Sequence, residues 1–295
     1  LEGVLEPYAE IRYLPGREIA ARDVRDADAL IVRTRTRCDA ALLDGSRVRF
    51  IATATIGFDH IDLDYCRRRQ IGVATAAGCN ARGVLQWIAA VLHHLSQRDG
   101  WHPAEKTLGV VGAGHVGELV RRYAASWGFR VLTCDPPRAA REGGGDFVPL
   151  EEVARHCDLV TFHTPLDATT RRMADEALLR QLKPKAVVWD HEPDIDRRLL
   201  AGAILATPHI AGYSAQGKAN ATAMAVGAVA RRFALPLEGW YPAVAPSHPR
   251  PIGWDELAAT IGARYDIAAE SDTLKRHPER FEALRNGYSY REEYF

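Results

Sequence analysis

The sequence predicts an α/β protein with two doubly wound parallel-sheet domains and a small C-terminal α+β module. Three observations support this prediction. The 295 residues are about twice the length of an ordinary domain. Short apolar runs alternate with polar stretches of helical spacing, as they do in βαβ units. Five prolines between positions 236 and 251 mark a linker before a polar, aromatic tail.

The first domain is expected over residues 1–96. Residues 29–32 and 50–52 are apolar runs without alternation, which suits strands whose two faces are both covered by helices. Asn80 opens a mainly apolar stretch over residues 84–95, with a polar interruption at Gln86, and we expect a helix of about four turns there. The stretch 98–103 contains a glycine and a proline that end this helix, so we place the domain boundary near residue 97.

The second domain is expected over residues 97–208. Its strands are expected at 107–112, 130–134, 158–162, 186–188 and 203–205, with a helix at 118–127. The segment 216–233 is rich in alanine and valine at helical spacing, and we expect it to be buried. Residues 236–295 then form the C-terminal module.

The charge balance and the cysteines exclude several classes of function. The chain has 38 basic and 38 acidic residues, so it lacks the net positive charge that neutralises phosphates, and we expect no nucleic-acid partner. No apolar run approaches the ~20 residues that span a bilayer, so we expect no membrane partner. The five cysteines show neither a disulfide framework nor zinc-ligand spacing. We therefore expect no metal, a cytoplasmic location and a small-molecule partner.

Residues 112–117 carry the string GAGHVG, which matches the GxGxxG pattern of Rossmann-like, dinucleotide-binding sheets. The string follows an expected strand and opens an expected helix. There the glycines allow a tight turn and the helix N-terminus attracts a pyrophosphate. An ordinary structural turn is the alternative explanation. The predicted cofactor contacts are Gly112, Gly114, His115, Val116 and Gly117.

Asp135 stands at the end of the next strand, about 20 residues further on. A carboxylate at this place accepts hydrogen bonds from ribose hydroxyls and repels a 2′-phosphate, so NAD is the expected cofactor. Arg138 lies close by and weakens this preference slightly, and a helix cap is the other explanation for Asp135. Thr164 follows a later strand at the carboxyl edge of the sheet, where it either contacts the cofactor or ends the strand.

Several strings resemble those of the D-isomer-specific 2-hydroxyacid dehydrogenases, over nearly the whole chain. They are VRT at 32–34, TATIGFDH at 53–60, AGCN at 77–80, CDPPR at 134–138, TFHTP at 161–165, TPHIAGY at 207–213, YDI at 265–267 and FEAL at 281–284. The resemblance implies a substrate domain completed by residues 209–235, an NAD-binding domain, and a C-terminal module that forms a homodimer. It further implies a role in vitamin B6 biosynthesis.

The resemblance also implies the chemistry. His209 would take the proton from the C2 hydroxyl of the substrate, and an imidazole suits this role because its pKa lies near neutrality. Glu192 would orient His209 and stabilise its charged form. Outside the string TPHIAGY, a single histidine would more simply be a packed or surface residue, and Glu192 an ordinary loop acid.

The substrate-binding residues implied by the resemblance are Thr34, Thr55 and Tyr213, and Gly212 would lie against the cofactor. Arg33 offers a planar fork of donors for a carboxylate or phosphate, although a structural salt bridge explains it equally well. The expected substrate is a small phosphorylated 2-hydroxy acid, 4-phospho-D-erythronate.

One part of the family pattern is missing. The resemblance implies an Asn-x-x-Arg-Gly string after the strand at 186–188, with an arginine that clamps the substrate carboxylate, and no such string occurs. The strand instead runs into WDHEP at 189–193, which in the family comes one strand–helix unit later. Either the protein has lost this unit, or roughly thirty residues are absent from the sequence. The start at Leu1 favours the second explanation, which predicts no bond between Val188 and Trp189.

Two other functions stay open. One keeps the chemistry and changes the acid, for example to 3-phosphoglycerate or an unphosphorylated hydroxy acid. The other is a non-catalytic protein that senses NAD on the same fold, since fold alone does not fix function. A site with His209 and Glu192 but without the arginine clamp should bind the nucleotide and turn over poorly.

Overall fold

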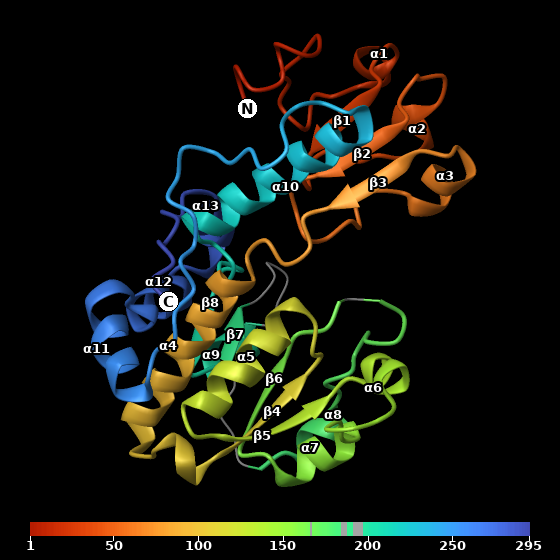
Figure 1. The fold of residues 1–295 in the computed structure, drawn as a ribbon. Helices are drawn as coiled ribbons and strands as arrows, with labels where there is room; N and C mark the ends of the chain where they lie inside the picture. Colours follow the sequence, from red (N-terminus) through yellow and green to blue (C-terminus); the bar gives the residue numbers. More distant parts are fainter. Residues whose placement is uncertain (166, 184–187, 191–196) are drawn as a thin grey trace. The chain divides into compact units, whose positions relative to one another are not determined.

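The computed structural model describes residues 1–165, 167–183, 188–190 and 197–295. The chain divides into two compact units. The first contains residues 1–80 and 216–246, and the second contains residues 81–215 and 247–295 (Figure 1). Each unit is built on a parallel sheet, as the sequence predicts.

The first unit has a three-stranded parallel sheet in the order β1-β2-β3. One face packs against the apolar side of α10, through residues such as Phe50, Ala52 and Val229. The other face carries Leu30 and Ile51 and is covered by the three short helices α1, α2 and α3. The elements are α1 (Ala21–Val24), β1 (Ala29–Val32), α2 (Ala40–Leu43), β2 (Phe50–Thr53), α3 (Leu63–Arg68), β3 (Gly72–Thr75) and α10 (Ala215–Phe233).

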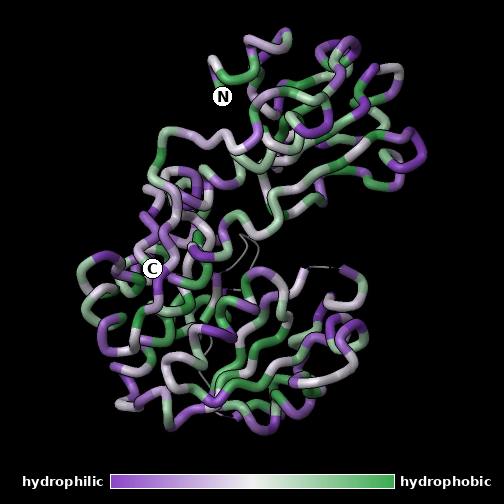
Figure 2. Tube along the Cα trace, viewed as in Figure 1, coloured by the Kyte–Doolittle hydropathy of each residue, from purple (hydrophilic) through white to green (hydrophobic). Residues whose placement is uncertain are grey.

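The second unit has a sheet in the order β5-β4-β6 and a separate two-stranded ladder of β7 and β8, all parallel. Figure 2 shows the hydrophobic run along the central strands. The elements are α4 (Ala81–Asp99), η1 (Pro103–Glu105), β4 (Thr107–Val111), α5 (His115–Ser126), β5 (Arg130–Cys134), α6 (Pro136–Glu142), α7 (Leu150–His156), β6 (Leu159–Phe162), α8 (Glu176–Gln181), β7 (Val188–Asp190), α9 (Arg197–Gly202), β8 (Leu205–Thr207), α11 (Trp254–Arg264), α12 (Ile267–Arg276), η2 (Pro278–Arg280) and α13 (Phe281–Asn286).

The boundary between the units lies at Asn80 and not near residue 97, where we expected it. The reason is the packing of α4. Its buried side chains, Leu85 and Leu92 among them, share one core with Leu108 of β4 and Val120 of α5. Residues 81–96 therefore belong to the second unit. The chain returns to the first unit at Gln216, whereas we expected the segment that completes this unit to begin at residue 209.

The C-terminal residues differ from the expected α+β module at 236–295. Residues 236–246 belong to the first unit, and residues 247–295 pack within the second. There they form α11, α12, α13 and η2, with one β-bridge between Arg291 and Ser214. Trp254 contacts Trp101, Trp127 and Phe129 through their rings. The segment is helical because its apolar residues, such as Leu257 and Ile261, recur on one helix face that the core of the second unit buries.

Strand β7 spans Val188–Asp190. We expected the strand at 186–188, and residues 186 and 187 lie outside the described part. Likewise β8 begins at Leu205, whereas we expected a strand at 203–205.

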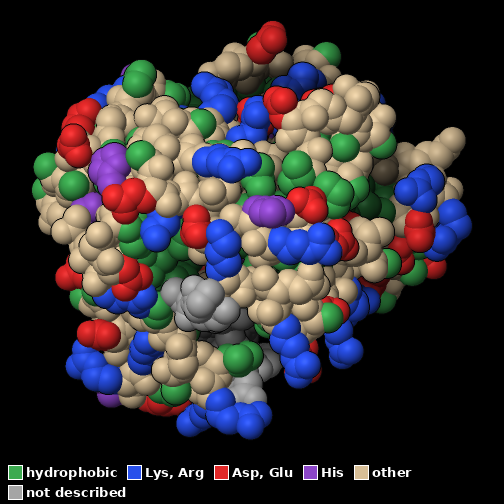
Figure 3. All heavy atoms as spheres, turned by 90° about the horizontal axis from the view of Figure 1, so that it is seen from below, with side chains coloured by type: hydrophobic (Ala, Val, Ile, Leu, Met, Phe, Trp, Pro, Cys, Tyr) green, Lys and Arg blue, Asp and Glu red, His purple; other side chains and the backbone are tan. Residues whose placement is uncertain are grey.

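No helix of the described residues combines the length and the apolar character that a bilayer crossing requires. On the face drawn in Figure 3, basic and acidic side chains are interspersed over the described residues.

Candidate active site

The turn after β4 has two glycines that no other residue could replace without a shift of the backbone. Gly112 has φ +87°, and a β-carbon there would lie 2.6 Å from the carbonyl oxygen of His163. A β-carbon at Gly117 would lie 1.8 Å from the carbonyl oxygen of Gly112. The first and third glycines of the motif therefore serve the tight turn and the close helix packing that dinucleotide sites require.

The second glycine of the motif faces open space. Gly114 is the N-cap of α5, and a β-carbon there would meet nothing within 4 Å. Gly114 and His115 are exposed, and no side chain caps this end of the helix. The first N–H groups of a twelve-residue helix thus point to a clear site with a favourable dipole. The residues present fit the pyrophosphate of a dinucleotide.

Asp135 joins the glycine turn to the next strand. Its carboxylate accepts hydrogen bonds from the N–H of Ala113 at 2.8 Å and from the N–H of Arg138 at 2.9 Å. The second bond makes Asp135 the N-cap of α6, which was the alternative explanation for this residue. A carboxylate has about four acceptor sites, so these two bonds leave room for ribose hydroxyls.

Arg138 is already occupied by acidic partners. Its Nη1 lies 2.7 Å from Glu118 Oε2 and donates to the carbonyl oxygen of Ala113, and its Nε donates to Glu142. Partial burial raises the pKa of Glu118, but hydrogen bonds from Arg121 and Arg138 outweigh this and hold the pKa below its ordinary value. A 2′-phosphate would have to compete with these carboxylates for Arg138, so the arrangement favours NAD.

The end of β6 lies against the glycine turn. The carbonyl oxygen of His163 and the methyl group of Thr164 are the atoms nearest to a β-carbon built on Gly112. The structure therefore brings Thr164 to the predicted cofactor site. The neighbouring His163 is paired with Thr161 at 3.0 Å, and burial lowers the pKa of its imidazole to about 4.

His209 lies in a turn that directly follows β8. Its φ is +55°, a left-handed conformation that is uncommon outside glycine. The side chain is half-buried. Its predicted partner, Glu192, lies outside the described residues. The structure therefore describes the predicted base but not the carboxylate that we expect to orient it.

Asp190, at the end of β7, is a carboxylate that our sequence analysis did not identify. Its Oδ1 accepts from the Thr207 hydroxyl at 2.8 Å and from the Ile210 N–H at 2.7 Å, and its Oδ2 accepts from the Ala211 N–H at 2.8 Å. Burial raises the pKa of Asp190 above its ordinary value, although the Ala211 N–H and nearby His209 act in the opposite direction. The side chain therefore holds the backbone on both sides of His209.

Gly212 and Tyr213 continue the same turn. The ring of Tyr213 stacks on Tyr290, with centroids 5.4 Å apart and an angle of 11° between the rings. Its hydroxyl accepts a hydrogen bond from Arg285 Nε at 3.2 Å. Residues near the C-terminus thus contact the predicted substrate-binding tyrosine. Sequence reasoning missed them because nothing in their local pattern indicates a contact with residues about seventy positions earlier.

The remaining predicted substrate residues lie in the first unit. Thr34 and Arg33 follow β1 and are exposed, whereas Thr55 follows β2 and is half-buried. Because Val32 pairs with Thr53 in register, these two strands end at the same edge of the sheet. The Thr55 hydroxyl bonds to Thr53 Oγ1 and to the carbonyl oxygen of Gly57. Among the described residues no ion pair to Arg33 is found, so the structural salt bridge that we considered is not seen.

Among the described residues, no group of three His, Cys, Asp or Glu side chains is arranged to hold a metal ion.

The chain is similar to known dehydrogenases. Residues 80–191 match the model of the D-isomer specific 2-hydroxyacid dehydrogenase, NAD binding domain. An erythronate-4-phosphate dehydrogenase of Bacteroides thetaiotaomicron is 41% identical, with 96% of this chain and 91% of the relative covered. One from Ectopseudomonas mendocina is 44% identical over 80% of this chain and 70% of the relative.

Solved structures agree on the fold. The NAD⁺-bound 3-phosphoglycerate dehydrogenase of Entamoeba histolytica has a TM-score of 0.63 at 22% identity, covering 78% of this chain and 87% of that one. The D-lactate dehydrogenase of Aquifex aeolicus, in complex with NAD and lactic acid, has a TM-score of 0.56 at 21% identity, covering 78% and 90%.

The alignment lengths reveal an internal difference from the relatives. The alignment with the Bacteroides thetaiotaomicron protein runs over 318 positions, although 96% of 295 residues is about 283 residues. About 35 aligned positions of that relative therefore have no counterpart in this chain.

The relative from Bacteroides thetaiotaomicron is covered almost completely, and the family model matches the part of the chain that holds the glycine turn. The chain therefore belongs to the D-isomer-specific 2-hydroxyacid dehydrogenase family, in the group of relatives named erythronate-4-phosphate dehydrogenase.

Proposed function

We propose that this protein oxidises 4-phospho-D-erythronate to 3-hydroxy-2-oxo-4-phosphooxybutanoate with NAD, a step in the biosynthesis of pyridoxal 5′-phosphate. The observation that carries the proposal is the 41% identity to an erythronate-4-phosphate dehydrogenase over 91% of its length. The open N-terminus of α5 and the occupied Arg138 support NAD as the cofactor.

In this reaction the glycine turn would hold NAD, which would supply the acceptor for the hydride that leaves C2 of the substrate. His209 takes the proton of the C2 hydroxyl, so that the oxygen can form the carbonyl group as the hydride leaves. The proton then passes from the imidazole to water. We assign to Glu192 the role of stabilising the imidazolium, because a carboxylate beside a histidine favours the charged form. Glu192 lies outside the described residues, so its role rests on the family resemblance.

The substrate is proposed to bind through four side chains. Thr34 and Thr55 would hold the acid, since both follow strands that end at one edge of the first unit's sheet. Arg33 is exposed and offers a fork of donors for a carboxylate or phosphate. Tyr213 would donate from its hydroxyl, which already accepts a hydrogen bond from Arg285.

The test is NADH formation from matched substrates. The purified protein with NAD should reduce the cofactor faster with 4-phospho-D-erythronate than with 3-phosphoglycerate or an unphosphorylated hydroxy acid. His209→Asn should reduce the reaction to a small residual rate and leave the affinity for NAD nearly unchanged. Faster turnover of 3-phosphoglycerate would change the substrate, and an unchanged rate in His209→Asn would exclude His209 as the base.

A second candidate is a protein that binds NAD without turnover. The observation that favours it is the absence of the Asn-x-x-Arg-Gly string, together with the roughly 35 positions of a relative that have no counterpart here. Calorimetric binding of NAD, with no NADH produced from any of the three acids, would support this candidate over the dehydrogenase.

We further propose a cytoplasmic homodimer. The dimer rests on the family resemblance of the C-terminal residues, and light scattering during gel filtration would test it: a mass of 32.6 kDa would exclude the dimer, and twice that mass would support it. The location is supported by the five cysteines, which are all buried and show no disulfide.

A further inference from the structure

The two residues after His209 lie between the half-buried carboxylate of Asp190 and the buried guanidinium of Arg291. The N–H groups of Ile210 and Ala211 donate to the carboxylate of Asp190, and their carbonyl oxygens accept from the guanidinium of Arg291. We propose that Asp190 and Arg291 are positioning residues that hold the His209 turn in the conformation needed for proton transfer. This inference rests on the proposed function of His209 as the base.

The bonds on the Asp190 side are short and use both carboxylate oxygens. The distances to the Ile210 and Ala211 nitrogens are 2.7 and 2.8 Å, and Asp190 also accepts from the Thr207 hydroxyl. Thr207 in turn accepts from the indole N–H of Trp87 at 3.1 Å. Because Thr207 ends β8 and Asp190 ends the neighbouring β7, the paired strands fix the carboxylate relative to the start of the turn.

The bonds on the Arg291 side come from the last residues of the chain. Nη2 donates to the carbonyl oxygens of Ile210 at 3.2 Å and Ala211 at 2.7 Å, and Nη1 donates to the Tyr288 hydroxyl at 2.6 Å. The guanidinium lies over the ring of Tyr265, 4.5 Å from its centroid. Arg291 is only 9% exposed, so its charge needs these partners and its position is closely determined.

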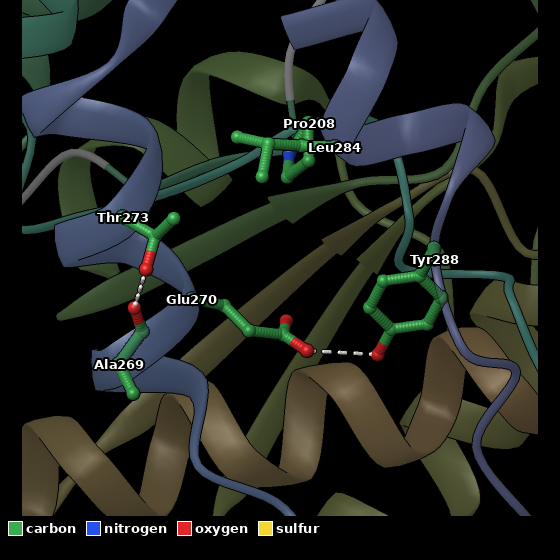
Figure 4. A pocket seen from close by; sticks show the side chains of 6 residues that line it. All are labelled: Pro208, Ala269, Glu270, Thr273, Leu284 and Tyr288. Carbon is green, nitrogen blue, oxygen red and sulfur yellow. Dashed lines mark hydrogen bonds between the residues drawn. The ribbon is translucent and has the colours of Figure 1, made fainter. Parts of the chain in front are cut away.

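A third group completes this cluster. Glu270 accepts from the hydroxyls of Tyr265 at 2.7 Å and Tyr288 at 2.9 Å, so the two rings that contact Arg291 are themselves anchored. Figure 4 shows the Glu270 carboxylate and the Tyr288 hydroxyl pointing toward each other. They line a cavity of about 230 Å³ with Pro208, the residue before His209. The cluster of Glu270, Tyr265, Tyr288 and Arg291 therefore lies next to the turn that contains His209.

The arrangement explains how His209 keeps a φ of +55°. Relaxing this φ means turning the N–Cα bond of His209, which swings the peptide group that follows it. Here that rotation would remove the Ile210 N–H from Asp190, and a shift of the next peptide group would remove carbonyl oxygens from Arg291. Hydrogen bonds to charged groups are stronger than those between neutral groups, so both charges oppose the relaxation.

The test uses conservative variants and a matched control. Asp190→Asn and Arg291→Lys keep size and polarity, and Arg264→Lys is the control, because Arg264 is exposed and lies over the ring of Tyr294 in the same C-terminal segment. With the full chain and saturating NAD, we expect the first two variants to lower kcat about tenfold or more while the Kd for NAD changes less than about twofold. The control should change neither quantity.

Amide hydrogen exchange supplies a readout that does not depend on activity. The amides of Ile210 and Ala211 should exchange at least about tenfold faster in Asp190→Asn and Arg291→Lys than in the control. The variants should also shift the midpoint of the imidazole-dependent limb of the kcat/KM profile. In the His209→Asn background, Arg291→Lys should lower the residual rate no further.

The outcomes separate the two proposals. Faster exchange with an unchanged kcat, or a loss of kcat that the control shares, would overturn the positioning role. A wild-type protein that turns over no 2-hydroxy acid would overturn the proposed function. In that case, unchanged exchange at Ile210 and Ala211 in both variants would overturn the positioning role as well. Faster exchange would show that Asp190 and Arg291 stabilise the turn but have no role in catalysis.

Discussion

The carbonyl oxygen of Gly112 lies 1.8 Å from the place that a β-carbon on Gly117 would occupy. No relaxation of a side chain can relieve such a contact, because the oxygen belongs to the backbone of the turn itself. The glycine turn of this protein is therefore fixed by two glycines five positions apart, and a third, Gly114, has a different role.

Gly117→Ala should disrupt the turn, whereas Gly114→Ala should only fill the space in front of it. We expect Gly117→Ala to lower the free energy of unfolding by about 1–3 kcal/mol or more, as overpacked sites do, and to lower the affinity for NAD with it. Gly114→Ala should leave stability within about 0.5 kcal/mol, since nothing lies within 4 Å of the added carbon.

Gly114→Ala should nevertheless weaken NAD binding about tenfold, because the methyl group would occupy the approach to the N-terminus of α5. Chemical denaturation and calorimetric titration with NAD measure the two quantities. NAD binding by Gly114→Ala at the wild-type affinity would mean that the pyrophosphate does not approach this glycine.

The preference for NAD should depend on how Arg138 is neutralised. Glu118→Gln removes the partner that lies 2.7 Å from Nη1, so Arg138 should become available to a 2′-phosphate. We expect the ratio of the Kd values for NADP and NAD to fall about fivefold to tenfold. Glu142→Gln is the matched control, because Glu142 contacts Nε and is half-exposed, and its effect should be smaller. An equal effect of both variants would point to net charge alone.

Burial of His163 should make stability depend on pH. Its pKa in the folded protein is about 4, whereas the unfolded chain has the ordinary value of 6.5. Below pH 6.5 the unfolded chain binds a proton that the folded protein excludes. The free energy of unfolding should therefore fall as the pH decreases from 6.5 to about 4, at no more than about 1.4 kcal/mol per pH unit.

His163→Asn isolates this contribution. His60 and His93 also have pKa values lowered by burial, so the wild-type curve alone would not identify the responsible group. The difference in unfolding free energy between wild type and His163→Asn should be constant above pH 6.5 and should diminish below it. Urea unfolding at a series of pH values measures this difference, and parallel curves would contradict the assignment.

The sequence predicted the parts of this structure that local pattern determines. The strands expected at 29–32 and 130–134 are confirmed, the strand expected at 107–112 ends one residue earlier, at Val111, and the strand–turn–helix context of the glycine motif is confirmed. The helix at 84–95 is also confirmed, within the longer α4. Its assignment to the first domain failed because a run of apolar residues shows that a helix is buried but not which core buries it.

The sequence could not predict the residues that hold the His209 turn. Arg291 contacts carbonyl oxygens about eighty positions earlier, and its own neighbourhood is a short polar tail with no motif. Asp190 lies within a string that we interpreted through Glu192 alone. Both side chains act on backbone groups, which every residue possesses, so no particular residue type at the turn indicates their presence.

The sequence predicts that residues 186–197 form one uninterrupted segment. Trypsin should release residues 186–197 as the peptide AVVWDHEPDIDR, since it cleaves after Lys185 and after Arg197. Tandem mass spectrometry of the digested protein checks this directly. A longer segment with an Asn-x-x-Arg-Gly string in place of that peptide would contradict the printed sequence and restore the arginine clamp.

If the peptide is found, the chain lacks the arginine clamp, and we expect an effect on KM for the substrate. A carboxylate without a bidentate arginine loses strong, directional hydrogen bonds, so KM for the 2-hydroxy acid should exceed millimolar values while the Kd for NAD stays in the ordinary range. Guanidinium ions added to the assay should then raise kcat/KM, because they can occupy the place of the missing side chain. A low KM without any such rescue would show that another cation, with Arg33 the first candidate, already holds the carboxylate.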